Sequence, residues 1–179
     1  MKRRPSVKLI CVTAVCLALC CILPMAFHSV GLGSTLSPMH IPVLLCGIVC
    51  GGFYGLICGI VGPILSSVLT GMPPVPMLIR MIPELAVYGL AAGLAMKYIR
   101  TGKHPLDLYI SLIIAMVLGR VAGGIATALF YLGTGEAFTL ATFATSYFVT
   151  GLPGIVAHLV LVPALALTLT KAGVVPKRY

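Results

Sequence analysis

Long stretches without a charged side chain are the feature that most constrains the fold of this chain. Hydrophobic residues make up 60% of its 179 residues, and charged residues make up only 8%. Soluble domains carry about 25% charged residues, so this composition favours helices embedded in a lipid bilayer. Several stretches reach the roughly 20 residues that an α-helix needs to cross the hydrocarbon core.

The Lys and Arg residues lie almost entirely at the ends of these stretches. Because cytoplasmic loops of membrane proteins carry an excess of Lys and Arg, the pattern predicts that both termini and the middle loop are cytoplasmic. The formal net charge of +9 would suggest nucleic acid in a soluble protein. Here the basic residues flank apolar runs, so no nucleic-acid partner is expected. Ten of the twelve lie in three groups: Lys2, Arg3, Arg4 and Lys8; Lys97, Arg100 and Lys103; Lys171, Lys177 and Arg178.

Glycine and proline residues set the expected helix boundaries. The sequence predicts a single all-α membrane domain over residues 1–179. The second helix is short, since about ten residues cover only about 15 Å. We therefore expect it to pack among the other helices, with Gly47, Gly51 and Gly52 allowing close approach. The six expected transmembrane helices are at about 8–28, 41–50, 54–70, 77–98, 107–132 and 143–170.

The remaining motifs predict no signal-peptide cleavage, no metal site and no catalytic activity. The apolar run after Met1 is too long for a typical signal peptide and is expected to remain as the first helix. The seven Cys residues lie in apolar runs without the spacing of a zinc site, so they are expected to be packing residues. We expect no metal and no cofactor. The chain has no phosphate-binding loop or nucleophile elbow, which indicates that it is no enzyme and does not hydrolyse ATP itself.

Three ionisable residues inside the apolar stretches are candidates for function, because a charge in the membrane is costly. Arg80 and Glu84 are four residues apart, so they can pair on one helix face. If they do, Arg120 has no counter-ion within the spans, and an anionic ligand, most simply a carboxylate, could supply one. A structural ion pair, with Arg120 bonded to backbone carbonyls, is the alternative.

Other polar residues fall near the outer ends of the expected helices. His40 lies in Ser37-Pro-Met-His-Ile-Pro42, where the prolines favour an extended segment that could close over an external cavity. Tyr147 and Thr150 offer hydroxyl groups at the depth of Arg80. His158 lies deeper in the last helix. It could have a functional role, or it could equally form a structural hydrogen bond between helices.

Several motifs resemble the substrate-binding (S) components of energy-coupling factor (ECF) transporters. The resemblance follows the chain in order over nearly its whole length. The motifs are Ser37-Pro-Met-His-Ile-Pro-Val-Leu-Leu-Cys-Gly47, Tyr54-Gly-Leu-Ile-Cys-Gly59, Leu69-Thr-Gly-Met-Pro-Pro74, Glu84-Leu-Ala-Val-Tyr-Gly89, Gly119-Arg120 with Gly123, and Gly151-Leu-Pro-Gly154.

The resemblance implies a six-helix protein of the bacterial plasma membrane that captures a vitamin or related nutrient from outside. It also implies association with a transmembrane coupling subunit and two cytoplasmic ATPases. In S components a small-residue face on the first helix packs against the coupling subunit, and Ala14 and Ala18 fit that pattern. The subfamily resembles the pantothenate type, with the substrate under the first outer loop. The residues assigned to that site are His40, Arg80, Glu84, Arg120, Tyr147 and Thr150.

Two other functions remain open at this stage. The chain could be a proton-coupled secondary transporter that uses Glu84, although it shows no evident inverted repeat. It could also be an intramembrane enzyme that uses Glu84 and His158 as acid and base.

Overall fold

The computed structural model describes residues 7–29, 37–134, 139, 145 and 151–173. Within these residues every regular element is a helix and no strand is present, so the predicted all-helical class is confirmed. Five helices are long and apolar enough to cross a membrane, and the sixth, α3, is a short apolar helix. The helices are α1 (Val7–Ser29), α3 (His40–Cys50), α4 (Gly52–Thr70), α5 (Val75–Tyr98), α6 (His104–Thr134) and α8 (Leu152–Lys171).

The largest difference from the expected boundaries lies at the start of the last helix. The sequence predicts a helix over 143–170, whereas α8 begins at Leu152 and follows Gly151, which is in a turn. Pro153 occupies the first turn of α8, where its missing N–H costs no hydrogen bond. It therefore marks the start of α8. Most of residues 143–150 lie outside the described part of the chain.

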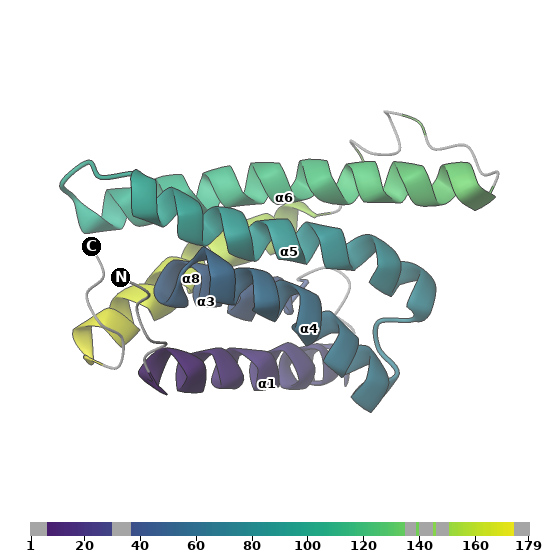
Figure 1. The fold of residues 1–179 in the computed structure, drawn as a ribbon, viewed down its shortest axis with the longest axis horizontal. Helices are drawn as coiled ribbons and strands as arrows, with labels where there is room; N and C mark the ends of the chain where they lie inside the picture. The colour runs from purple at the N-terminus through teal and green to yellow at the C-terminus, as the bar shows by residue number, and fades with distance from the viewer. Residues whose placement is uncertain (1–6, 30–36, 135–138, 140–144, 146–150, 174–179) are drawn as a thin grey trace.

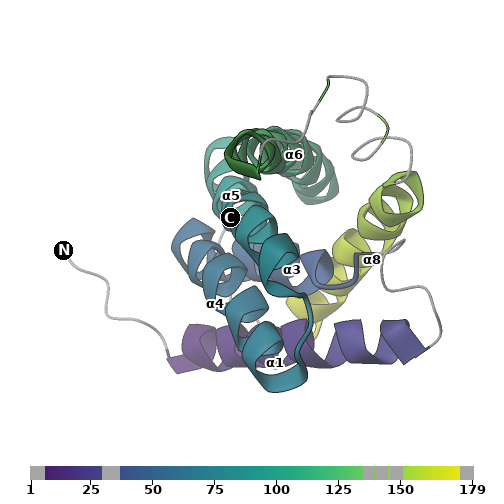
Figure 2. The same ribbon diagram turned by 90° about the vertical axis from the view of Figure 1, so that its right-hand side faces the viewer.

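The helices form a bundle around α3. Figure 1 shows α5 and α6 running side by side, with α1 on the opposite side of the bundle. In Figure 2, α3 lies among α1, α4, α5 and α8. All eleven residues of α3 are buried, which is the packing that a helix of this length needs. About 16 Å of helix cannot cross the bilayer, so α3 is covered by protein instead.

The closest packing in the bundle is between α5 and the α3–α4 hairpin, and it depends on glycine. Gly55 of α4 contacts the backbone of Gly89 in α5, and a Cβ atom on either residue would overlap the other's carbonyl group. A Cβ on Gly47 of α3 would overlap the same Gly89 carbonyl, and one on Gly93 would overlap the backbone of Gly52. Backbones this close exclude every larger residue. We call this contact between Gly47, Gly52, Gly55, Gly89 and Gly93 the glycine interface.

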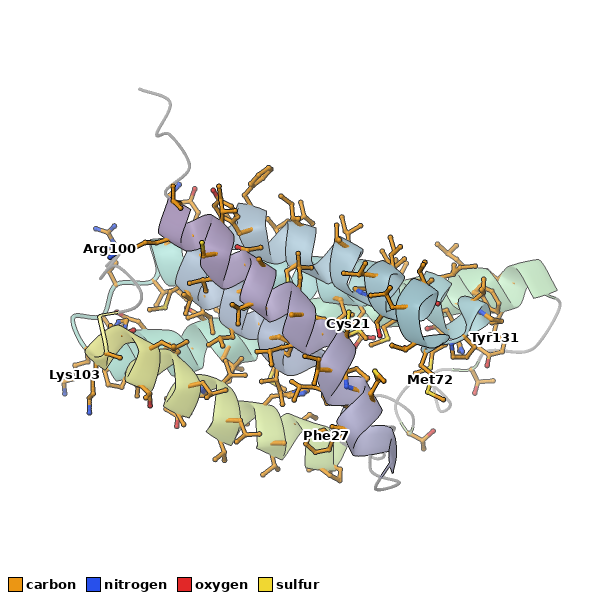
Figure 3. The ribbon with its side chains drawn as sticks, turned by 90° about the horizontal axis from the view of Figure 1, so that it is seen from below. Cys21, Phe27, Met72, Arg100, Lys103 and Tyr131 are labelled. Atoms are coloured by element: carbon orange, nitrogen blue, oxygen red, sulfur yellow. The ribbon has the colours of Figure 1, made fainter. Side chains whose placement is uncertain are left out.

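Basic residues of different helices gather at one end of the bundle. Figure 3 shows Arg100 and Lys103 at this end, with Met72 and Tyr131 toward the other. In Figure 1 the first turn of α1 and the last turn of α8 lie on the same side as the loop between α5 and α6. Asp107 closes that loop, because its Oδ1 accepts hydrogen bonds from the backbone N–H of Thr101 (2.8 Å) and from the Thr101 hydroxyl (2.5 Å). The prediction that both termini and the middle loop are cytoplasmic requires such a grouping.

Candidate ligand site

Polar and ionisable side chains gather in the interior at the N-terminus of α3. His40 is the first residue of α3, Glu84 and Tyr88 come from α5, and His158 comes from α8. His40, Tyr88 and His158 are buried, and the Glu84 side chain is only 12% exposed. These four residues, which we call the His40 cluster, join three helices in a bundle whose other buried residues are mostly apolar.

His40 makes contact with every other member of the cluster. Its Nε2 lies 3.6 Å from Oε1 of Glu84. Its ring meets the Tyr88 ring edge to face at 5.1 Å between centroids, and it stacks on the His158 ring at 5.5 Å. Its Nδ1 lies 3.1 Å from the carbonyl oxygen of Ser37. His40 is therefore the centre of the cluster.

The partners of His40 indicate the roles of its two ring nitrogens. A carbonyl oxygen only accepts hydrogen bonds, so the Nδ1 that faces Ser37 is assigned as the donor. Nε2 faces Oε1 of Glu84 at 3.6 Å, so the imidazole ring and the carboxyl group form a polar contact between α3 and α5.

Glu84 and Tyr88 reach their positions because α6 carries glycines opposite them. The two residues are four apart on α5 and so share a face. A Cβ on Gly119 of α6 would lie 2.7 Å from the Tyr88 ring, and a Cβ on Gly123 would lie 2.8 Å from Oε2 of Glu84. Only glycine leaves room for these two side chains at the α5–α6 contact. Arg120 follows directly after Gly119.

The two arginines differ in their surroundings. Arg120 is 8% exposed, near the middle of α6. Arg80 is half-buried near the start of α5, where its Nε donates to the carbonyl oxygen of Pro76 at 3.2 Å. The Arg80 guanidinium lies 5.5 Å from the Phe130 ring centroid and 5.6 Å from that of Tyr131. Contacts of this kind stabilise a cation over the face of an aromatic ring.

The pairing of Arg80 with Glu84, which the four-residue spacing allows, does not form in the structure. Glu84 is in contact with His40 of α3 instead. Spacing along one helix could not reveal a competing partner on another. Tyr88 and Ser37 were also missed as members of the site, although Tyr88 lies one helical turn after Glu84 on the same face.

The remaining candidate residues lie elsewhere. Tyr147 and Thr150 are outside the described residues. Ala14 and Ala18 are both exposed on α1. In the described part of the chain, no three His, Cys, Asp or Glu side chains are grouped so that they could hold a metal ion.

A family model described as "ECF transporter, substrate-specific component" matches residues 8–166. The chain belongs to this family. Substrate-specific components are the substrate-binding subunits of transporters and are not enzymes, and membership implies a small-molecule substrate and ECF coupling and ATPase modules as partners. The multiple apolar helices agree with a multi-pass membrane protein. No curated protein and no solved structure matched this S component.

Proposed function

We propose that this S component captures an anionic, vitamin-like micronutrient from the extracellular side for an ECF importer, with pantothenate as the first candidate. The substrate is held beside the His40 cluster by Arg120 and Arg80, with Tyr147 and Thr150 completing the site. Transport is driven by the partner ATPases. The chain itself binds and presents the substrate.

The observation that carries this proposal is a buried arginine at the level of a buried polar cluster. The chain has only three acidic residues. Glu84 lies against His40, and Asp107 is bonded to Thr101 at the basic end of the bundle. Basic residues therefore outnumber acidic residues, twelve to three, in the chain as a whole. A carboxylate ligand would reduce that excess and could bind a guanidinium bidentately.

The site residues have different proposed roles. Arg120, the more deeply buried arginine, binds the anionic group. Arg80, half-buried over Phe130 and Tyr131, attracts the substrate nearer the outer end. Glu84 holds the His40 ring in place and can accept a hydrogen bond from a substrate hydroxyl.

The proposed orientation puts the basic end of the bundle in the cytoplasm of a bacterial cell. All six helices then lie within the plasma membrane and both termini are cytoplasmic, in accord with the positive-inside rule. Ala14 and Ala18, exposed on α1, form the face for the transmembrane coupling subunit. That subunit connects the S component to two cytoplasmic ATPases.

A binding assay with matched arginine variants tests the site. The detergent-purified chain is first screened by thermal shift against carboxylate vitamins that include pantothenate, since ligand binding stabilises the folded state by mass action. The dissociation constant of the best ligand is then measured by calorimetry. Arg120→Ala is expected to weaken binding by about 100-fold or more, because it removes a buried charge from a charge pair. Arg120→Lys is expected to retain part of the affinity.

Arg100→Ala is the matched control, because it removes an exposed arginine from the opposite end of the bundle. Its affinity should equal that of the wild type. Unchanged affinity in a folded Arg120→Ala variant would show that the site is assigned wrongly. Substrate accumulation in liposomes that contain this chain alone would instead support a secondary transporter.

A further inference from the structure

Three nitrogen atoms lie within hydrogen-bonding distance of the Ser37 carbonyl oxygen. The backbone N–H of His40 lies 3.1 Å from the Ser37 oxygen, and His40 Nδ1 lies at the same distance. Nε2 of His158 lies 3.4 Å from this oxygen. Two of these donors belong to α3 itself, whereas the third comes from α8, 121 residues further along the chain. His158 is therefore a direct link between α8 and the segment that leads into α3.

Ser37 has a backbone conformation that needs such support. Its φ is 43°, and no other described non-glycine residue has a positive φ. Left-handed backbone is sterically disfavoured for residues that carry a Cβ. It is retained where surrounding contacts hold it. The bonds to its carbonyl group fix the direction in which the chain enters α3.

His158 supplies a polar contact where α8 packs on α3. The helix packs on α3 and α6, and Figure 2 shows it beside α3 at the edge of the bundle. His158 is 1% exposed, and its ring also stacks on that of His40. The same side chain thus contacts the backbone and the histidine at the two ends of Ser37–His40. Movement of α8 away from α3 would break both contacts.

We propose that His158 is a latch that holds the Ser37–His40 segment over the ligand site and slows the release of bound substrate. The proposal rests on the proposed function, because it concerns the same site. His158 acts through Ser37 and His40 and is thus a positioning residue. Opening breaks the contact of His158 with the Ser37 carbonyl and its ring contact with His40, and both form again when α8 returns to α3.

Two amide variants separate the hydrogen bond from simple space filling. The side-chain amide of Gln reaches the position of Nε2, whereas that of Asn reaches only the position of Nδ1. His158→Gln can therefore donate to the Ser37 carbonyl, and His158→Asn cannot. A role in packing alone would not favour Gln over Asn in this way.

Hydrogen exchange of the ligand-free protein provides the first measurement. The amides of His40 and Ile41, which bond to the carbonyls of Ser37 and Pro38, report on the segment. In His158→Asn and His158→Ala they are expected to exchange about fivefold faster than in the wild type, as the loss of one hydrogen bond predicts. In His158→Gln the rate should stay near the wild-type value. Amides of α5 around Gly89 should not change, which excludes general unfolding.

His104→Ala is the control, because it removes a histidine at the start of α6 and should leave exchange at His40 unchanged. Equal exchange of the segment in the wild type, His158→Asn and His158→Ala would overturn the latch. So would equal acceleration in the Gln and Asn variants. Neither result depends on which substrate the protein binds.

Dissociation of radiolabelled pantothenate, or of the carboxylate vitamin selected in the thermal-shift screen, provides the second measurement. We expect release about fivefold faster in His158→Asn and near normal in His158→Gln, with little change in the association rate. Faster exchange with an unchanged release rate would overturn the role in substrate retention. If the wild type binds no carboxylate vitamin, the proposed substrate class fails, and the exchange data alone decide whether the segment is latched.

Discussion

The glycine interface and the His40 cluster hold the same helix, α3, in two different ways. At the glycine interface the backbones of α3, α4 and α5 touch, and no side chain separates them. At the His40 cluster, side chains from α3, α5 and α8 meet through the His40–Glu84 contact, ring contacts and a shared carbonyl group. The first contact fixes the distance between helices. The second can lose individual bonds while the helices stay in place.

One helix supplies both kinds of contact. Along α5, Gly89 and Gly93 face the α3–α4 hairpin, whereas Glu84 and Tyr88 face His40 and α6. The two sets lie on different sides of the same helix, so a rigid contact positions a polar one. A substitution on the glycine side should therefore affect folding, and one on the polar side should chiefly affect binding and local order.

The largest effect is expected from Gly89→Ala, which tests the rigid contact. The added Cβ would overlap the carbonyl group of Gly55, and backbone cannot move aside as a side chain can. The cost should exceed the roughly 1–3 kcal/mol typical of overpacked cores. We expect loss of monodisperse protein in size-exclusion chromatography in detergent.

Gly133→Ala in α6 is the matched control, because nothing lies within 4 Å of its added Cβ. Alanine has the higher helix propensity, so this variant should be as stable as the wild type or slightly more stable. Normal yield and thermal stability of Gly89→Ala would show that the glycine interface is not the rigid contact described.

An intermediate effect is expected when the His40 cluster loses the carboxyl group of Glu84. Glu84→Ala removes the carboxyl group that faces Nε2 of His40 and the side chain that packs on Gly123. We expect a loss of about 3 kcal/mol, which corresponds to roughly 6–12 °C in the thermal midpoint.

Glu84→Gln separates charge from hydrogen bonding at the same position. The amide keeps the packing against Gly123 and can form a hydrogen bond with the His40 ring, so the loss should be about 1 kcal/mol. Equal midpoints for the Ala and Gln variants would indicate that the contact with His40 contributes nothing to stability.

The smallest effect is expected far from both regions, at the loop between α5 and α6. Asp107→Ala removes the two hydrogen bonds from Thr101 and should lower the thermal midpoint only slightly. Substrate affinity should stay at the wild-type value, since Asp107 lies at the basic end of the bundle. A large loss of affinity would mean that the two ends of the bundle are coupled.

The sequence predicts the helical architecture well because its signals are local. Glycine and proline mark the limits of α3, expected at 41–50 and observed at His40–Cys50. Its short length predicts that it is enclosed by other helices. Pro153 was the exception, because proline is equally compatible with the first turn of a helix and with an interruption inside one.

The site was harder to predict because its contacts are between helices. Glu84 and Arg120 could be singled out by the cost of a charge in an apolar environment, and His40 by its place in a segment flanked by prolines. Their partners depend on which helix faces which, and that made Arg80 seem the natural partner of Glu84. The Ser37 carbonyl could not be found at all, because every residue has one and only the fold gives this one three donors.

The enclosure of α3 also has a consequence for how the protein enters the membrane. An eleven-residue helix is too short to be retained by lipid as an independent segment during synthesis. It must insert together with α4, and part of its surface stays uncovered until α5 and α8 have been made. During biogenesis we therefore expect a stage in which α3, the most deeply buried helix, is in the membrane but is not yet covered by the C-terminal half of the chain.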